Sequence, residues 1–431
     1  MAARTRKNDS WPSPGSRKLW TIAAGGVAVV TATGVVVSLV TGTESAPATS
    51  SPAPAASAPA PGGQRGSVEH RVPVGYPRSE AGAKAAAVNY TTVSGSAWYL
   101  TEKAPRHRAV SVMASQPAAK AMEKHADRAA EQFAGDLGGT STKNRRKHAL
   151  ARTGVFSARP LAVSADEATV RLWTTTVRGS AAGSEVPKAA YRSVTVRLVW
   201  ERNDWKLSGS SSGPGLVAPI DARQASNSPG DFDSYDVSAE AEDPALSGVI
   251  GSTGFPGPYA RSERGAHGAA VNAAVLYGDP RFFVDGDWRH RMLKATAAPD
   301  VLEAVTSETD TTAELVAENR GLGADGRTGD GGVLVTRTAV LGTRSISYSG
   351  QAATVELWTA SMGGVAGDDE SQRPQVAFLR MTVDLVRTAG TWKTTSVAPA
   401  DPLVPAPPNT EAAPAERFAE VGGAGNAPAS A

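Results

Sequence analysis

The stretch Tyr76–Asn89, YPRSEAGAKAAAVN, returns 183 residues later as Tyr259–Asn272, YARSERGAHGAAVN. The tripeptide at 106–108, Arg-His-Arg, recurs at the same offset at 289–291, and later blocks match at offsets of 185 and 187. Only two copies are present, and each is long enough to bury a core of its own. The duplication therefore predicts two similar domains and not a solenoid of stacked repeats.

Each copy opens with signals for a helix. Ser79 and Ser262 are suited to cap its N-terminus, because each precedes a glutamate and an alanine-rich segment. Gly95 and Gly278 are suited to end the helix. A second helix is expected after Pro117 in the first copy, and after residue 300 in the second.

Strands are expected after the helices. Val170 and Leu172 alternate with polar or aromatic residues, as do Val196 and Leu198, and the second copy repeats both patterns. Each copy thus predicts two helices and then roughly four antiparallel strands. We expect an α+β unit whose curved sheet wraps around the helices.

An apolar run without charge extends from Leu19 to Val40, and about 20 such residues can span a bilayer. Basic residues precede the run, so a transmembrane helix over 19–42 is expected to leave the N-terminus in the cytoplasm and everything after it outside. A cleaved signal peptide is the alternative, but its apolar region is usually shorter. The expected localisation is the cell membrane, with a single span.

Composition divides the rest of the chain. The expected parts are a cytoplasmic basic tail (1–18), the transmembrane helix (19–42), a Pro/Ala/Ser tether (43–71), a first cone-like domain (72–215), an acidic linker (216–254), a second cone-like domain (255–404) and a disordered tail (405–431). The chain has no cysteine, which excludes disulfides, thiolate catalysis and zinc–thiolate sites. A net charge of +2 gives no reason to expect nucleic acid as a direct partner.

The duplicated helix-then-strand order behind a single N-terminal span resembles the cone-shaped fold of nuclear transport factor 2 and ketosteroid isomerase. More narrowly, it is similar to the TcpC-like bitopic conjugation proteins and the VirB-type scaffold subunits of type IV secretion systems. The resemblance implies tandem cone-like domains, each with two helices packed on a curved antiparallel sheet, behind one transmembrane helix. The overall composition is typical of an exported actinobacterial protein.

Among polar residues, the clearest match between the two copies is the repeated triplet of arginine, histidine and arginine. A functional interpretation assigns anion binding or acid–base chemistry to His107 and His290. We prefer a structural role in the segment between the two helices, because no partner carboxylate or metal-ligand spacing is evident. The triplet residues are Arg106, His107, Arg108, Arg289, His290 and Arg291. No catalytic residue, cofactor site or metal site is predicted.

A possible interaction surface comes from a reversal of charge. The first copy has Arg171 and Arg197 where the second has Glu356 and Asp384, on the side of the strands away from the aliphatic positions. Solvated sheet faces change charge freely, so a chance exchange is the simpler interpretation. The alternative is that these faces meet, within one chain or between neighbouring molecules.

The predicted function is a non-enzymatic, membrane-anchored scaffold that contacts itself and other membrane-complex subunits in a conjugation-like or type IV secretion-like transfer apparatus. This role is implied by the resemblance. The alternative is a lipid- or small-ligand-binding accessory protein of a mammalian-cell-entry-type transporter, which would need a roomy apolar cavity in one cone. Cones filled by Trp173, Trp358, Trp205 or Trp392 would favour the scaffold.

Overall fold

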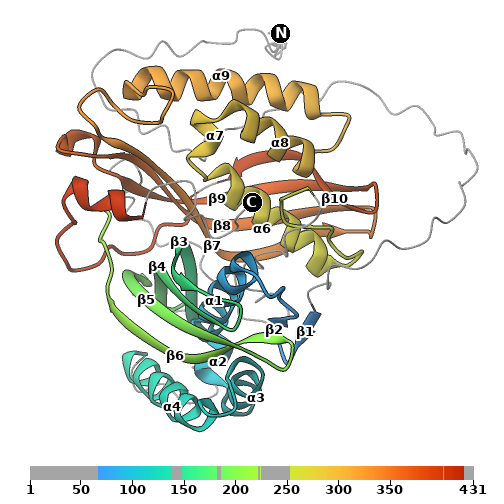
Figure 1. Ribbon diagram of the computed structural model, residues 1–431, viewed down its shortest axis with the longest axis vertical. Coiled ribbons are helices and arrows are strands. Elements are labelled where there is room, and N and C mark those ends of the chain that lie inside the picture. Colours follow the sequence, from blue (N-terminus) through green and yellow to red (C-terminus); the bar gives the residue numbers. More distant parts are fainter. Residues whose placement is uncertain are drawn as a thin grey trace, which may run out of the picture.

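The computed structural model describes residues 67–137, 148–181, 186–221, 224, 253–400 and 402–421. These residues form two units of like topology, each with four helices followed by a four-stranded antiparallel meander (Figure 1). Unit one contains β1 (Ser67–Glu69), β2 (Val72–Val74), α1 (Glu80–Ser94), α2 (Ala97–Thr101), α3 (Lys103–Met113), α4 (Ala119–Asp136), β3 (Ala149–Val163), β4 (Glu167–Ser180), β5 (Lys188–Glu201) and β6 (Asp204–Pro214). Unit two contains α6 (Glu263–Tyr277), α7 (Arg281–Val284), α8 (Gly286–Thr296), α9 (Leu302–Arg320), β7 (Val333–Tyr348), β8 (Ala352–Ala366), β9 (Gln375–Thr388) and β10 (Thr391–Ala400), with short 3₁₀ helices η3 (Glu370–Gln372) and η4 (Ala415–Glu420).

The repeated serine begins the same helix in both units. The Ser79 hydroxyl accepts a hydrogen bond from the backbone N–H of Gly82 at 3.1 Å, and Ser262 accepts one from Gly265 at 3.0 Å. Each bond satisfies one of the backbone donors that a helix start leaves without a partner. The predicted caps are confirmed, and α1 and α6 end at Gly95 and Gly278, as expected.

The inner face of each sheet packs on its own first helix. In unit one the aliphatic positions Val170, Leu172, Val196 and Leu198 are at most 1% exposed, and they join the alanines of α1 in one apolar cluster. Unit two repeats this arrangement between α6 and strands β8 and β9. The predicted inward positions are therefore core positions.

Two repeat-matched β-bulges redirect side chains on the first strand of each sheet. The ladder between β3 and β4 shifts at Phe156 and again at Leu161, and the ladder between β7 and β8 shifts at Leu341 and Ile346. A bulge inserts one extra residue and changes the face to which side chains point. Phe156 and Leu341 are buried between the units, whereas Leu161 and Ile346 are 43% and 55% exposed.

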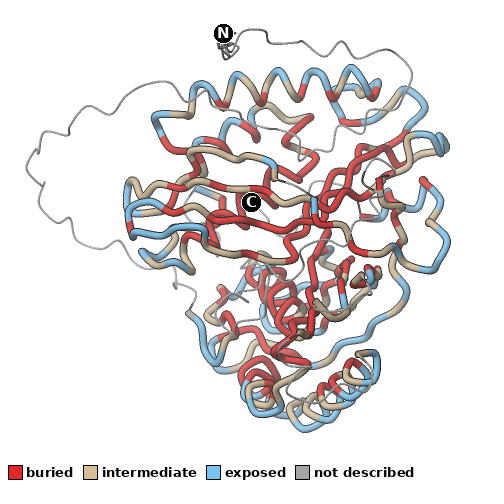
Figure 2. Tube along the Cα trace, turned by 180° about the vertical axis from the view of Figure 1, so that it is seen from behind, coloured by how far each residue is buried: buried red, intermediate tan, exposed pale blue. Residues whose placement is uncertain are grey.

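The outer faces of the two sheets, turned away from α1 and α6, pack against each other. One apolar cluster contains residues of β3, β4 and β5 together with residues of β7, β8 and β9. Figure 2 shows buried chain concentrated where the units meet. A Cβ added to Gly154 would lie 2.9 Å from the Cβ of Ala339, and these two residues are equivalent in the repeat. Contact between equivalent positions is the mark of a two-fold-like interface.

The segment that follows the last strand of each unit packs against the other unit. After β6, the carbonyl of Pro219 accepts a hydrogen bond from Val376 of β9 at 2.9 Å. After β10, the carbonyl of Ala406 accepts one from Ala189 of β5 at 2.8 Å. Both pairs of residues are related by the offset of 187. Phe418 of η4 is fully buried in the shared cluster, 5.9 Å from the ring of Trp173.

The fold prediction was wrong in two respects. Each unit has four helices where two were predicted, because 97–113 and 281–296 are helical and not connecting loops, and unit one adds the β1–β2 hairpin. No helix within the described ranges is both long enough and apolar enough to cross a bilayer. The helix predicted at 19–42 lies outside the described residues.

The boundaries at the ends of the units also differ from the sequence analysis. Residues 216–221, assigned there to the acidic linker, and 405–421, assigned to a disordered tail, are ordered against the opposite unit. The segment 405–421 is rich in proline and alanine, and buried side chains such as Leu216, Leu403 and Phe418 hold the two segments in place.

The close approach at Gly154 generates a stability prediction. Gly154→Ala should lower the free energy of unfolding by about 1–3 kcal/mol, because the new methyl group meets the rigid Cβ of Ala339 in a packed interface. Chemical denaturation measures the change. Gly209→Ala in β6 is the matched control, since its Cβ would meet no atom within 4 Å. Equal effects of the two substitutions would contradict the described interface.

Candidate functional site

The space between helix and sheet, where a cone fold could hold a ligand, is filled by tryptophan in both units. Trp205 and Trp392 are at most 1% exposed. Their indole N–H groups donate to equivalent carbonyls, Trp205 to Pro77 and Trp392 to Ala260, both at 2.9 Å. Trp173 and Trp358 occupy the outer faces instead, within the cluster shared by the units. The indoles thus fill both the interiors and the interface.

A buried carboxylate inside unit one has a structural explanation. Asp204 is 5% exposed and accepts hydrogen bonds from the backbone N–H groups of Tyr76 and Trp205, both at 3.0 Å. In unit two the equivalent Thr391 hydroxyl accepts from the N–H of Tyr259 at 3.0 Å. A threonine can serve the same purpose, so the position requires an acceptor and not an acid.

One histidine lies between helix and sheet in unit two. His267 of α6 places Nε2 2.7 Å from the Ser345 hydroxyl and Nδ1 3.0 Å from the Thr343 hydroxyl. Burial lowers the pKa of His267, which favours the neutral ring. Both ring nitrogens are used in these hydrogen bonds, and the equivalent position in unit one is Lys84.

The repeated Arg-His-Arg triplets do have a carboxylate partner. In unit one, Arg106 donates from Nε and Nη2 to Oδ1 of Asp127 at 2.9 and 2.7 Å, and from Nη1 to the carbonyl of Tyr99 at 3.0 Å. Nε2 of His107 lies 3.0 Å from the same carboxylate oxygen. The group connects α2, α3 and α4, and we call it the Arg–His–Asp clamp.

Unit two has the same clamp. Arg289 donates to Asp310 and to the carbonyl of Phe282, each at 2.8 Å, and Nε2 of His290 lies 2.9 Å from the Asp310 carboxylate. The sequence analysis missed both acids, although Asp127 and Asp310 are separated by the same 183 residues as the triplets. It also placed the triplets between helices, whereas they lie within α3 and α8. Arg108 and Arg291 are exposed and lie outside the clamps.

The clamp shifts the titration of its acid. Burial alone would raise the pKa of the Asp127 carboxyl, but hydrogen bonds from Arg106 and His107 outweigh burial and lower the pKa below its ordinary value. The pKa of Asp310 is lowered in the same way. The acids therefore stay ionised, as an ion pair that stabilises helix packing requires. Within the described residues, no group of three or more His, Asp or Glu side chains could hold a metal ion.

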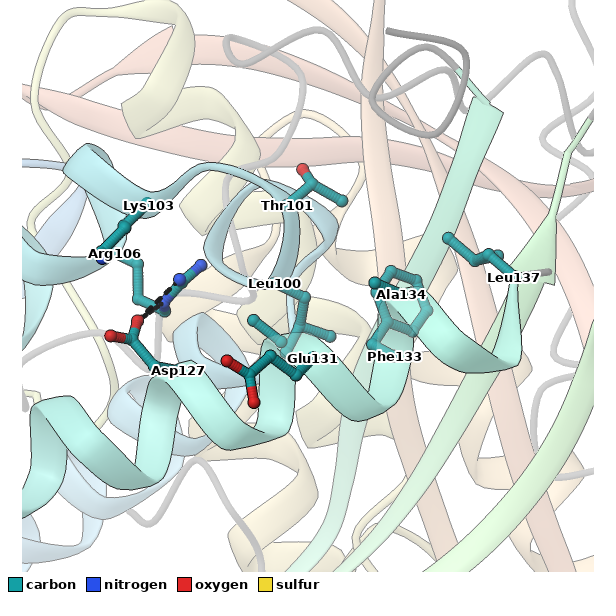
Figure 3. Close-up of a pocket in the computed structure, with 10 residues that line it drawn as sticks. Leu100, Thr101, Lys103, Arg106, Asp127, Glu131, Phe133, Ala134 and Leu137 are labelled. Carbon is teal, nitrogen blue, oxygen red and sulfur yellow. Dashed lines mark hydrogen bonds and ion pairs between the residues drawn. The ribbon is translucent and has the colours of Figure 1, made fainter. Parts of the chain in front are cut away.

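A pocket of about 250 Å³ opens beside the clamp of unit one, between α2 and α4 (Figure 3). Leu100, Phe133 and Leu137 supply apolar walls, while Lys103 and Glu131 supply charge. Ligand pockets usually measure roughly 300–1,000 Å³, so this one suits a single side chain better than a small-molecule ligand. Unit two has the larger Phe283 where unit one has Leu100.

A row of arginines lies on the outer face of sheet one, beyond the shared cluster. Arg159 of β3 stands opposite Arg171 of β4, and Arg197 of β5 is diagonal to Arg171. All three are exposed, and no described carboxylate forms an ion pair with them. Like charges directly opposite each other destabilise a sheet, so the fold gains nothing from this row.

The equivalent positions of sheet two are compensated. Arg344 stands opposite Glu356, forms an ion pair with it at 2.9 Å and donates to it from Nη2 at 3.1 Å, and Glu356 is only 6% exposed. Asp384 accepts hydrogen bonds from the hydroxyls of Thr354 and Ser396, both at 2.7 Å. The predicted interaction residues therefore lie on the outer faces, but the two sets do not pair with each other.

A buried cluster of charge lies where α1 meets unit two. Lys84 is 2% exposed, and Asp279 of unit two is fully buried and bonded to Arg281. Burial, opposed by the carboxylate of Glu80 and reinforced by Arg281 and Arg337, lowers the pKa of Lys84 to about 8. The Lys84 ammonium is therefore expected to lose its proton at mildly alkaline pH.

Comparison with known proteins identifies no family for this chain. No protein-family model and no curated protein matches the chain. A solved structure described as the intermembrane space region of chloroplast protein ARC6 is 19% identical and covers 32% of this chain and 95% of its own, with a TM-score of 0.23. An Ntf2 like protein involved in plasmid conjugation is 9% identical and covers 74% of this chain and 97% of its own, with a TM-score of 0.18.

The second of these structures belongs to the broad class that the sequence resembles, an NTF2-like protein of conjugation. The narrower assignment to TcpC-like or VirB-type proteins has no family match. Neither TM-score reaches 0.5, so the function must be argued from the residues of this chain.

The clamp generates a prediction of stability and pH dependence. Asp127→Asn should lower the free energy of unfolding by about 1–3 kcal/mol at neutral pH, because buried Arg106 loses its counter-charge. The folded-state pKa of Asp127 is depressed, so its contribution is present above the ordinary carboxyl pKa and is lost as the pH falls through the depressed value. Denaturation at several pH values measures the difference from the native chain.

Asp310→Asn should behave alike in unit two, whereas Glu131→Gln, an exposed acid on α4 beside the same pocket, should change stability by less than about 0.5 kcal/mol. An Asp127→Asn effect no larger than that of Glu131→Gln would contradict a stabilising clamp.

Lys84 generates a second pH prediction. Its folded-state pKa of about 8 lies below the ordinary 10.5, so the unfolded chain binds more protons between these values. The native chain should therefore gain stability relative to Lys84→Met as the pH rises from 8 to 10.5, by up to about 3 kcal/mol. Below pH 8 the difference should be flat. A difference independent of pH throughout would contradict the buried, partly neutralised lysine.

Proposed function

We propose that this chain is a non-enzymatic scaffold subunit of a conjugation-like or type IV secretion-like transfer apparatus, which acts through protein–protein contacts with itself and with other subunits of that complex. The assignment to a transfer apparatus rests on the resemblance of the sequence to conjugation proteins. The scaffold role rests on how the residues of the two units pack.

The main support for this proposal is that side chains fill the interior of each unit. A cone-fold enzyme or lipid carrier works from a cavity between helix and sheet. In both units that space holds a fully buried indole, Trp205 or Trp392, fixed by a hydrogen bond to the chain before the first helix. Buried polar groups there, such as Asp204 and His267, are engaged in hydrogen bonds with the unit's own residues.

By contrast, the outer surfaces of the two units already form a contact between folded units. The outer faces of the sheets and the segments after β6 and β10 form an extensive apolar interface within the chain. The same faces continue into exposed regions with arginine and large apolar side chains, and such residues are enriched in protein interfaces. Ligand binding is less well supported, since the pocket beside α4 is small.

Site-specific photo-cross-linking in cells tests the proposal. A photoreactive residue at Leu315, which is 51% exposed on α9, or at Leu161 should give adducts with subunits of a transfer apparatus, identified by mass spectrometry. The same group at buried Val170 is the control and should give no intermolecular adduct.

Native mass spectrometry of the purified protein addresses the alternative. The scaffold predicts no stoichiometric lipid. Bound lipid together with an absence of adducts would overturn the scaffold in favour of a ligand carrier.

A further inference from the structure

The arginine row on sheet one requires an explanation that the fold does not provide. Arg159, Arg171 and Arg197 gather three exposed positive charges on adjacent strands, and the described residues offer no carboxylate to balance them. Guanidinium groups bind carboxylates well because their planar donors match the geometry of the two oxygens. The row is therefore suited to an acidic surface outside this unit.

The repeat provides a control for the requirements of the fold. Sheet two has the same topology and the same bulges, yet its three equivalent positions are Arg344, Glu356 and Asp384. Arg344 and Glu356 neutralise each other, which leaves Asp384 as the uncompensated charge of the set. Its carboxylate accepts from two hydroxyls and retains acceptor capacity for a guanidinium.

These two faces already fit each other elsewhere in the same molecule. The outer faces of sheets one and two pack together near Gly154 and Ala339, through a cluster that includes Phe156 and Leu341 on the first pair of bulges. The exposed Arg171 and the partly buried Asp384 continue the same outer faces beyond that cluster.

The second pair of bulges places apolar side chains beside the charges. Leu161 is 43% exposed and Ile346 is 55% exposed. Few large apolar residues among those described are this exposed. Bulges often redirect a side chain at a functional surface, and here both units expose one at the equivalent position. Each face thus combines charge with an apolar anchor.

We propose that copies of this chain associate head to tail, the arginine face of unit one (Arg159, Leu161, Arg171, Arg197) binding the Asp384 face of unit two (Ile346, Asp384) of a second copy. The inference rests on the proposed scaffold role and names one partner of it. In this head-to-tail arrangement each contact uses one face of each copy, so the contact is heterologous and leaves one face free at each end. Successive copies then form a ring or an open filament.

Analytical ultracentrifugation of the full-length protein tests the contact. The native chain should self-associate with rising concentration, and the association should weaken as sodium chloride screens the charges. Arg171→Glu with Arg197→Glu should weaken it at least tenfold. Arg108→Glu, an exposed arginine on α3 remote from the sheet, is the matched control and should associate like the native chain.

A mixing experiment identifies the two faces as partners. Asp384→Arg should also fail to self-associate, and Asp384→Asn should show an intermediate loss with its neighbours' hydrogen bonds preserved. An equimolar mixture of the Arg171→Glu, Arg197→Glu chain and the Asp384→Arg chain should form a 1:1 complex, because the first retains a native unit-two face and the second a native unit-one face. Circular dichroism establishes that each variant is folded.

A native chain that stays monomeric at all concentrations would overturn the proposal, as would a double arginine variant that associates like the native chain or a mixture that forms no complex. None of these outcomes concerns cross-linked adducts with other subunits. The photo-cross-linking experiment therefore tests the scaffold role separately.

Discussion

Each sheet has two apolar faces to bury, and this constraint explains most of the architecture. The helices of a unit cover the inner face, as the packing of Val170 and Leu172 on α1 shows. The outer face cannot be left to water, because it presents Trp173 or Trp358 with other large side chains. Burial of one such side chain contributes roughly 1.5–3 kcal/mol, so each unit is stabilised by the other. The segments after β6 and β10 cover the cluster further, and neither unit is complete without them.

Duplication lets one unit serve as a control for the other. Where both keep a residue, as with Arg106 and Asp127 against Arg289 and Asp310, the shared geometry shows a requirement of the fold. Where they differ but fill the same role, as with Asp204 and Thr391, a chemically suggestive group proves to be a structural acceptor. Where they differ without a shared role, as with Arg171 and Glu356, the fold does not dictate the residue.

Local patterns predicted local structure well. Ser79 and Ser262 identify helix starts, and alternating aliphatics identify strands and their inward faces, because both depend on residues close in sequence. The short helices α2 and α7 and the clamp were missed, since the partner of Arg106 lies 21 residues away and only helix packing brings it near. The ordered segment at 402–421 was missed because its composition resembles a disordered chain, and a few anchors such as Phe418 are enough to fix it.

The internal symmetry also constrains how such a molecule can assemble. If both outer faces carried the same charge beyond the shared cluster, copies would meet through like faces that repel each other. Because Arg344 neutralises Glu356, Asp384 is the charge of unit two that complements the arginines of unit one, so attraction is expected only between unlike faces. The interface near Gly154 uses equivalent surfaces and closes within one chain, whereas the proposed head-to-tail contact uses unlike surfaces and can continue from copy to copy. On the proposed head-to-tail contact, a single duplicated module would supply one interface that completes the fold and a second that extends it.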